Sequence, residues 1–367
     1  MEKWGDTQIS TVDPDIHYSF AQIVQENGFD YEQHTVTTSD DYELTVMRVT
    51  SPEMKSGAPV VFLQHGLFSS AETWIMDRAE SVAFQLAKQG FDVWLGNNRG
   101  CYYSRRNRHL SPDKDRAQFF DYSFFELGKY DAPAQIDFVR ERTGSDKISY
   151  VGHSQGTSQM FAALSENFGD LQSKLNYFAA LAPIVNLKNS PNAFLQFFSD
   201  QWWFIKPQAE FLGIYEFRDP KVDSALRGFC AMFASVCDAL ENWLNIGDSP
   251  YDDKERGDVL NARPGSSASL KQLIHYGQNM RSGEYKQYDY GSDAENIAHY
   301  GSKIVPVIVL ESIKHVPISM FVGKEDDLGD PTDNRHVRTR LSTLKSYREY
   351  DGVDHYSYLI GKDMSFV

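Results

Sequence analysis

A serine flanked by two glycines, Gly152-His153-Ser154-Gln155-Gly156, constrains the fold of this chain more than any other feature. It follows the apolar run 148–151 and precedes a stretch of helical character at 157–166. This pattern between a strand and a helix is typical of a nucleophile elbow, a turn so tight that the residues two before and two after the serine must lack bulk. The turn strains the serine backbone and exposes its hydroxyl above the sheet. The N–H of Gln155 then lies at a helix start, where it is free to bind negative charge.

The elbow pattern alone does not decide the function. Three fixed residues, each at about 7% usage, occur by chance in roughly one chain in ten of this size. The alternative interpretation is a glycine-rich turn that carries an ordinary serine. The decision depends on whether partners for Ser154 stand at suitable places downstream.

Composition excludes several classes of partner. The 367 residues carry a net charge of −15, which argues against nucleic acid and strongly anionic membranes and is compatible with a neutral substrate or a neutral interface. No apolar run approaches the roughly 20 residues of a membrane-spanning helix. The first residues contain no apolar segment of a signal peptide, so the chain taken literally is cytosolic or has lost its signal.

Three cysteines, Cys101, Cys230 and Cys237, are too few for a disulfide scaffold. Cys230 and Cys237 could pair, but two reduced, buried thiols fit the sequence as well. Their spacing matches no metal-site pattern, and we expect neither a metal nor a cofactor.

Apolar strands alternate with helices along most of the chain. Strands are expected at 42–49, 59–63, 91–95, 148–151, 177–184, 316–322 and 345–350, and helices at 74–89 and 123–142, the second with a kink at Pro133 and a stop at Gly144. This order predicts an α/β fold with a mostly parallel central sheet and helices on both faces. The alternation breaks after Pro183. We therefore expect a core formed by 1–185 and 303–367, interrupted by a mainly helical insertion at 186–302.

Strand order selects the histidine that serves Ser154. In a doubly wound hydrolase the acid and the histidine follow the serine, at the carboxyl ends of later strands. Five of the ten histidines precede Ser154, two lie in the insertion, His315 precedes a strand, and His336 lies in a polar surface stretch. His355 follows the final strand, where a general base is expected.

The acid is expected just after the strand at 316–322. Gly323-Lys324-Glu325-Asp326-Asp327 stands there, and from the residues alone Asp326 and Asp327 are nearly equal candidates, with Glu325 third. Most carboxylates of such a cluster belong to a solvated turn. The order Ser154, acid, His355 is that of a catalytic triad on this fold.

These roles predict acyl transfer by a serine. His355 would take the hydroxyl proton during attack and deliver it to the leaving alcohol, while the aspartate fixes the tautomer of the imidazole. The tetrahedral oxyanion needs preorganised donors. One is the N–H of Gln155, and the second is expected from the loop after 60–63, where Leu67 follows His65-Gly66. His65 and His153 are interpreted as hydrogen-bonding residues.

Several segments together resemble the acid lipase family of α/β-hydrolases, which includes gastric and lysosomal acid lipases and related steryl ester hydrolases. The matching segments span nearly the whole chain: Gln64-His65-Gly66-Leu67, Gly96-Asn97-Asn98-Arg99-Gly100, Tyr103-Ser104-Arg105, Gly152-His153-Ser154-Gln155-Gly156-Thr157, Ala182-Pro183, Tyr288-Asp289-Tyr290-Gly291, Gly323-Lys324-Glu325-Asp326, Asp330-Pro331 and His355.

The resemblance implies a role for each site residue. It makes Ser154 the nucleophile, His355 the base, Asp326 the acid, and Leu67 and Gln155 the oxyanion donors. It implies that the insertion is a cap with a mobile lid over an acyl-binding cleft. It also implies neutral ester substrates, namely triacylglycerols, sterol esters or simpler carboxylic esters, and a secreted or lysosomal location.

Eight aromatic residues between positions 194 and 215 mark the insertion. Most are expected to form the core of the cap, and a minority to contact the acyl chain or a lipid–water interface. Trp202 and Trp203 are the first candidates for such contacts, because adjacent residues on a helix cannot both face one core stripe. Phe198 is a further candidate for contact with substrate. The alternatives to a lipase are a soluble esterase for small esters and a lipid-binding protein without catalysis.

Overall fold

A nine-stranded, mostly parallel sheet forms the centre of the molecule. The computed structural model describes residues 13–217, 249–263, 266–362 and 364. The sheet order is β1-β2-β4-β3-β6-β7-β10-β11, with the short β5 paired to β2. The strands are β1 (Asp30–Thr37), β2 (Tyr42–Thr50), β3 (Val60–Gln64), β4 (Asp92–Gly96), β5 (Arg106–Asn107), β6 (Ile148–His153), β7 (Leu175–Leu181), β10 (Ile318–Gly323) and β11 (Leu344–Tyr350).

Strand direction explains where the functional loops meet. From β4 to β11 all neighbours are parallel, whereas β1, β2 and β5 pair antiparallel. The loops after β3, β6, β10 and β11 therefore emerge at one edge of the sheet. The seven strands expected from the sequence are confirmed within a few residues at each end. The strand β1 and the short β5 are additions that the sequence did not predict.

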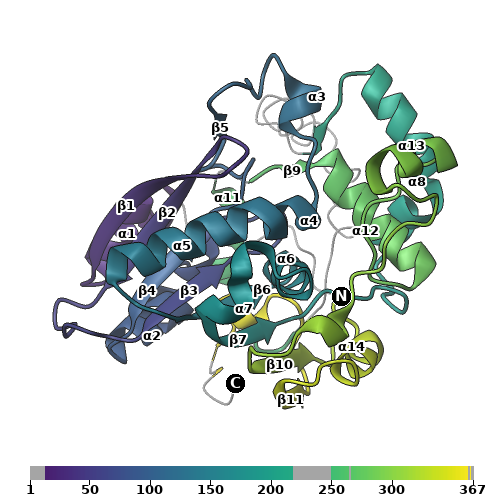
Figure 1. Ribbon diagram of the computed structural model, residues 1–367. Coiled ribbons are helices and arrows are strands. Elements are labelled where there is room, and N and C mark those ends of the chain that lie inside the picture. Colours follow the sequence, from purple (N-terminus) through teal and green to yellow (C-terminus); the bar gives the residue numbers. More distant parts are fainter. Residues whose placement is uncertain (1–12, 218–248, 264–265, 363, 365–367) are drawn as a thin grey trace, which may run out of the picture.

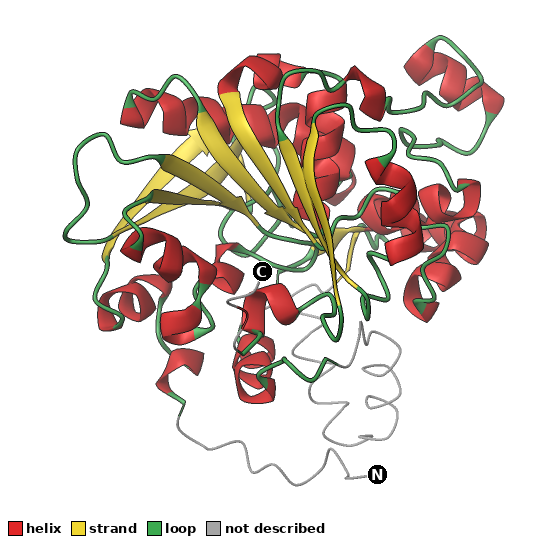
Figure 2. Cartoon of the chain, turned by 90° about the horizontal axis from the view of Figure 1, so that it is seen from below, coloured by secondary structure: helices red, strands yellow, loops and turns green. Residues whose placement is uncertain are grey.

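Side-chain alternation along the strands divides the interior into two cores. Val60 and Phe62 of β3 enter one core, and Val61 and Leu63 enter the other. Helices cover both faces of the sheet (Figure 2), as the apolar strands predicted.

The helices of the sheet domain are short. They are α1 (Phe20–Glu26), α2 (Val82–Lys88), α3 (Arg116–Phe119), α4 (Phe124–Glu126), α5 (Ala132–Thr143), α6 (Gln155–Ser165), α7 (Leu171–Lys174), α14 (Pro331–Arg338) and α15 (Ser357–Ile360). Short 3-10 turns join them at η1 (Pro14–Ile16), η2 (Ala71–Trp74), η3 (Arg78–Glu80), η5 (Phe168–Asp170) and η6 (Leu310–Ser312).

Two helical predictions are refined. The stretch 74–89 is not one helix, since two 3-10 turns precede α2. The helix from Ser123 begins with the expected capping box and ends at Gly144 in the left-handed conformation. Between α4 and α5 it contains a π-helical turn, η4 (Leu127–Asp131), which ends two residues before Pro133. Gly128 in that turn is needed because a side chain there would meet the backbone of α6.

The segment between β7 and β10 contributes no described strand to the main sheet. Its described elements are α8 (Ala193–Phe211), β8 (Glu216–Phe217), α11 (Lys254–Ala262), β9 (Ala268–Ser269), α12 (Leu270–Ser282) and α13 (Asp293–Tyr300). Helices α8, α12 and α13 gather beside the sheet (Figure 1). Gly277 of α12 lies against the backbone of Phe198 in α8, so these two helices pack closely. The boundaries at 186 and 302 stay a prediction.

The longest of these helices, α8, is not a membrane span. Within the described residues, every helix is too short or too polar to cross a bilayer.

Candidate active site

Ser154 occupies a strained position between β6 and α6. Its backbone has φ 53° and ψ −120°, a positive φ that side-chain-bearing residues rarely adopt. A Cβ at Gly152 would lie 2.7 Å from the carbonyl carbon of Gly156, and a Cβ at Gly156 would lie 2.4 Å from the carbonyl oxygen of Gln64. The two glycines of the motif are therefore required by close backbone contacts, as the elbow interpretation predicted.

Hydrogen bonds hold this strained turn. The Ser154 N–H donates to the Leu181 carbonyl oxygen of β7 at 3.1 Å. The Thr157 hydroxyl donates to the Ser154 carbonyl oxygen at 2.6 Å and accepts from the Ile184 N–H at 2.9 Å. Thr157 thus ties the elbow to the chain that leaves β7.

Asp326 and His355 meet at the same edge of the sheet. Asp326 lies three residues after β10, and His355 lies five residues after β11. The His355 Nδ1 is 2.9 Å from Asp326 Oδ2 and 3.0 Å from Oδ1, and both side chains are buried. Because a carboxylate only accepts, Nδ1 carries the ring proton and Nε2 is left as a base.

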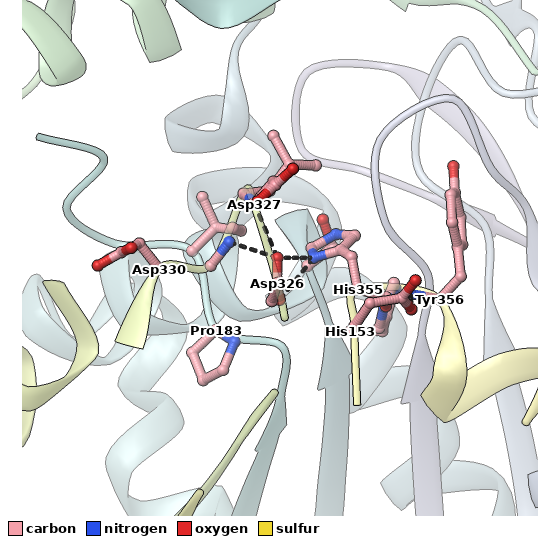
Figure 3. A network of polar contacts seen from close by, with 12 residues as sticks. His153, Pro183, Asp326, Asp327, Asp330, His355 and Tyr356 are labelled. Carbon is pink, nitrogen blue, oxygen red and sulfur yellow. Dashed lines mark hydrogen bonds and ion pairs between the residues drawn. The ribbon is translucent and has the colours of Figure 1, made fainter. Parts of the chain in front are cut away.

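The loop around Asp326 also fixes its carboxylate. Oδ1 accepts from the N–H groups of Leu328 at 2.9 Å and Gly329 at 2.7 Å. These contacts converge on Asp326 in Figure 3. Of the three candidate acids, the structure brings Asp326 to His355, while Glu325 is exposed and Asp327 is half-buried. Burial, followed by the negative charge of Asp326, raises the pKa of Asp327 above its ordinary value.

His153 connects the elbow to the loop of His355. Its Nε2 lies 2.8 Å from the His355 carbonyl oxygen, so Nε2 donates, and the two rings are 4.9 Å apart between centroids. Burial, with a smaller contribution from His355, lowers the pKa of His153 to about 3 and keeps its ring neutral. Within the described residues, the Ser154 hydroxyl makes no hydrogen bond to His355, and such contacts are often long in unliganded sites.

His65 shapes the loop that follows β3. Its Nε2 accepts from the Asn98 N–H at 3.1 Å, so the proton is on Nδ1, which donates to the Gly66 carbonyl oxygen at 2.7 Å. Burial lowers its pKa to about 4. A Cβ at Gly66 would lie 2.9 Å from the Ser154 Cβ, which shows how closely this loop passes the elbow.

The two expected oxyanion donors lie on the loops nearest to Ser154. Gln155 is the first residue of α6, so its N–H has no acceptor within the helix. Leu67 directly follows Gly66, and its side chain is half-buried against the larger core. The structure therefore places both backbone segments beside the serine, and their roles as donors stay predictions.

A polar network that the sequence analysis did not identify holds the Gln155 side chain. Its Oε1 accepts from Gln272 Nε2 of α12 at 2.7 Å, and the Tyr276 hydroxyl donates to Ser158 at 3.1 Å. Gln272 also accepts from the Ser269 N–H in a capping box. The spacing of Ser269 and Gln272 could have indicated the start of α12, but no local pattern indicates its contact with α6.

The three aromatic candidates in α8 have different surroundings. Phe198 is buried against α12, and Trp202 is half-buried with its ring 3.6 Å from the position of a Cβ on Gly291. Trp203 is 61% exposed. The two tryptophans thus face different environments.

The thiol of Cys101 is buried, which raises its pKa to about 12. Cys230 and Cys237 lie outside the described residues.

Sequence comparisons agree with this geometry. Residues 59–362 match the family described as alpha/beta hydrolase fold, and residues 20–78 match the partial alpha/beta-hydrolase lipase region. Gastric triacylglycerol lipase of Homo sapiens is 34% identical over 367 residues, covering 95% of this chain and 88% of the relative. The chain belongs to the acid lipase family of α/β-hydrolases.

Other family members and solved structures are similar over comparable lengths. The tear acid lipase-like protein of Mesocricetus auratus is 32% identical over 374 residues, covering 98% of this chain and 90% of the relative. The structure of DcsB with its substrate analogue has a TM-score of 0.52 at 13% identity, covering 90% of this chain and 94% of that chain. A bacterial membrane phospholipase A has a TM-score of 0.50 at 11% identity, covering 92% and 84%. These two structures show the fold alone.

Proposed function

We propose that the protein hydrolyses neutral lipid esters through an acyl-enzyme on Ser154, with His355 as the base and Asp326 as the acid. One observation carries the proposal: the strained turn of Ser154 lies at the same edge of the sheet as a buried carboxylate–imidazole pair. In that pair, Asp326 Oδ2 is 2.9 Å from His355 Nδ1. A surface serine and a structural ion pair would need neither the strain nor the common edge.

The chemistry follows from the orientation of each group. His355 Nε2 accepts the Ser154 proton as the hydroxyl attacks the ester carbonyl, and the imidazolium that forms is stabilised by Asp326. The N–H groups of Leu67 and Gln155 stabilise the oxyanion. His355 then protonates the leaving alcohol, and water releases the acyl group by the same steps.

An aromatic cluster beside the oxyanion loop supports an apolar acyl group. Phe68, next to Leu67, lies 5.6 Å from the ring of Phe217, which lies 5.7 Å from Phe194. Phe194 in turn lies 5.1 Å from Phe198 of α8. These ring contacts connect the loop after β3 with segment 186–302, which we propose is the cap.

Relatives and surface chemistry favour a lipid substrate at an interface. Gastric triacylglycerol lipases are among the relatives, by their names. In α8, Phe197, Phe204 and Phe211 recur every seven residues, which places them on one side of the helix. They are 45%, 54% and 88% exposed, and Trp203 is exposed nearby. We propose that this face of α8 contacts the lipid–water interface.

Hydrolysis of emulsified tributyrin and of dissolved p-nitrophenyl butyrate tests both parts of the proposal. Ser154→Ala should abolish both activities while the fold is preserved. Phe211→Ser should lower the emulsion rate by roughly tenfold and change the soluble rate little, since it removes apolar area only at the interface. Tyr177→Ser, in the amino-terminal half of β7, is the matched control and should affect neither rate.

Other outcomes would point to the alternatives. Activity confined to short, dissolved esters would favour a soluble esterase. Lipid binding without hydrolysis, in the intact chain, would favour a non-catalytic lipid-binding protein. Undiminished hydrolysis by Ser154→Ala would refute the proposed nucleophile. Comparing the rates of hydrolysis of triolein and cholesteryl oleate would show whether triacylglycerols or sterol esters are the preferred substrates.

A further inference from the structure

The Ser357 hydroxyl, two residues after His355, lies between the carboxyl groups of Asp252 and Asp354. Ser357 Oγ is 2.7 Å from Asp252 Oδ1 and 3.0 Å from Asp354 Oδ1. Asp354 is buried and directly precedes His355, whereas Asp252 is half-buried and comes from the segment before α11. Neither aspartate has a place in the acyl-transfer chemistry described above.

A count of donors and acceptors around the Ser357 hydroxyl favours a proton on one of these carboxyl groups. The Ser357 hydroxyl has one proton to donate and two lone pairs, and one lone pair accepts from the Asp354 N–H at 3.1 Å. It can therefore donate to Asp252 or to Asp354, but not to both. Two carboxylates would leave one oxygen facing a lone pair. A protonated Asp252 would donate to Ser357, which would donate to Asp354.

The segment that carries Asp252 is hydrogen-bonded to the chain on both sides of His355. The Ser249 hydroxyl donates to the Gly352 carbonyl oxygen at 2.6 Å. The Asp253 N–H donates to the Ile360 carbonyl oxygen at 2.8 Å, and the Lys362 N–H donates to the Tyr251 carbonyl oxygen at 2.7 Å. His355 lies between these attachments. A change in the spacing of Asp252 and Asp354 would therefore be transmitted to the imidazole.

Asp354 also shapes the turn that carries the imidazole. Its Oδ1 accepts from the N–H groups of Tyr356 at 2.9 Å and Ser357 at 3.0 Å. The backbone on the carboxyl side of His355 thus depends on the position of this carboxyl group, and the His153 contact fixes the His355 carbonyl oxygen.

The charged groups around the two carboxyl groups are of both signs. Within the described residues, neither Asp252 nor Asp354 forms an ion pair. Two sets of titratable groups surround the pair. On the side of the surface pocket that Asp252 lines, they are Asp253, Lys254, Glu255 and Lys362. On the side of the active site, they are Asp326, Asp327, Asp351, His355 and Tyr358. Lys362 already pairs with Asp253, at 3.3 Å.

We propose that Asp252 and Asp354 share one proton through Ser357 and that this proton-sharing pair positions the loop of His355. The pair consists of positioning residues and makes no contact with the reacting atoms. The inference rests on the proposed role of His355 as the base. Loss of the shared proton would leave two carboxylates repelling each other across one hydroxyl, and the loop would lose its fixed position.

The consequence is a loss of activity as pH rises through neutrality. Burial, followed by the charge of Asp354, raises the pKa of Asp252 to about 7. A carboxyl group whose pKa is higher in the folded than in the unfolded protein holds its proton more tightly when folded. The free energy of unfolding therefore falls as pH rises from the unfolded-state pKa to the folded-state pKa. The alkaline limb of the pH–rate profile should therefore contain the ionisation of this pair.

The kinetic test compares the full-length wild type with Asp252→Asn, using kcat/KM for p-nitrophenyl butyrate. The asparagine keeps a donor toward Ser357 and cannot ionise. The ratio of activity near pH 9 to activity near pH 5 should rise by about fivefold or more relative to the wild type. Asp351→Asn is the matched control, because Asp351 is an exposed carboxyl group on the same loop that pairs with Lys324. Its profile should follow the wild type.

Two other outcomes would overturn the inference. An unchanged ratio in Asp252→Asn would mean that the pair does not limit activity. A uniform loss at every pH, with the ratio unchanged, would mean that Asp252 acts only as a structural residue.

A second measurement separates this inference from the proposed function. The melting temperature of the wild type should fall more than that of Asp252→Asn as pH rises from about 5 to 8, whether or not any ester is hydrolysed. An inactive wild type with this difference would refute the ester hydrolase and keep the proton-sharing pair. Parallel melting curves would refute the pair. Asp354→Asn is the second variant if Asp252→Asn does not fold, and misfolding of both would show a purely structural role.

Discussion

Replacing Asp326 by asparagine keeps the shape of the side chain and reverses what it offers to His355. Oδ1 of Asp326 accepts two backbone N–H groups, from Leu328 and Gly329. The carbonyl oxygen of an asparagine would take that place, because an amide N–H₂ cannot accept. The amide nitrogen would then lie at the position of Oδ2, 2.9 Å from His355 Nδ1, and donate to it.

The expected result is a folded protein with the wrong imidazole tautomer. With Nδ1 as acceptor, the neutral ring carries its proton on Nε2, the atom that must accept the Ser154 proton. A wrong tautomer in a Ser-His-Asp site reduces kcat by about 10⁴-fold. At about 1.4 kcal/mol for each factor of ten, this is a loss of about 5 kcal/mol of transition-state stabilisation.

The assay is kcat for p-nitrophenyl butyrate, with circular dichroism as the check on folding. Asp327→Asn is the matched control, because Asp327 is the adjacent, half-buried carboxyl group. It should change kcat by no more than about threefold. A loss below tenfold in a folded Asp326→Asn, or a greater loss in Asp327→Asn, would refute the geometric argument.

Further predictions concern the surroundings of the site. Gly156→Ala should destabilise the fold by about 1–3 kcal/mol in urea unfolding, because the added Cβ would lie 2.4 Å from the Gln64 carbonyl oxygen. Gln272→Glu keeps the oxygen that accepts from Ser269 but removes the N–H donor to Gln155. We expect kcat to fall by about tenfold with KM little changed. An unchanged kcat would mean that the contact with α12 does not position Gln155. The free energy of unfolding of the wild type should decrease as pH falls from about 6.5 to 4, because burial lowers the pKa of His65 to about 4 and keeps it neutral in the folded protein. The decrease should be smaller in His65→Gln. An equal dependence of the free energy of unfolding on pH in the two proteins would refute this prediction.

Much of the sheet could be predicted from the sequence because its strands have local signals. The run 59–63 is apolar at each position, and in the structure alternate residues of β3 enter opposite cores. By contrast, β1 has only one buried residue, Val36, in eight. A half-exposed edge strand such as this lacks the continuous apolar pattern, so it was not predicted.

The candidate site divides in the same way. Ser154 and His355 follow from strand order, and the resemblance selects Asp326, which the structure places against His355. Long-range contacts had no local signal. Asp252 meets Ser357 across 105 positions of sequence, and Gln155 meets Gln272 across 117. Such pairs depend on how the segment between β7 and β10 packs on the sheet, which no periodicity encodes.

The central claim is that Ser154 is the nucleophile of this lipase-family site, and covalent trapping tests it most directly. A p-nitrophenyl alkylphosphonate should release about one p-nitrophenol per chain, and peptide mass spectrometry should find the phosphonyl group on Ser154. Ser154→Ala should release none and carry no label. A label on another residue, or hydrolysis by Ser154→Ala at the rate of the wild type, would contradict the account.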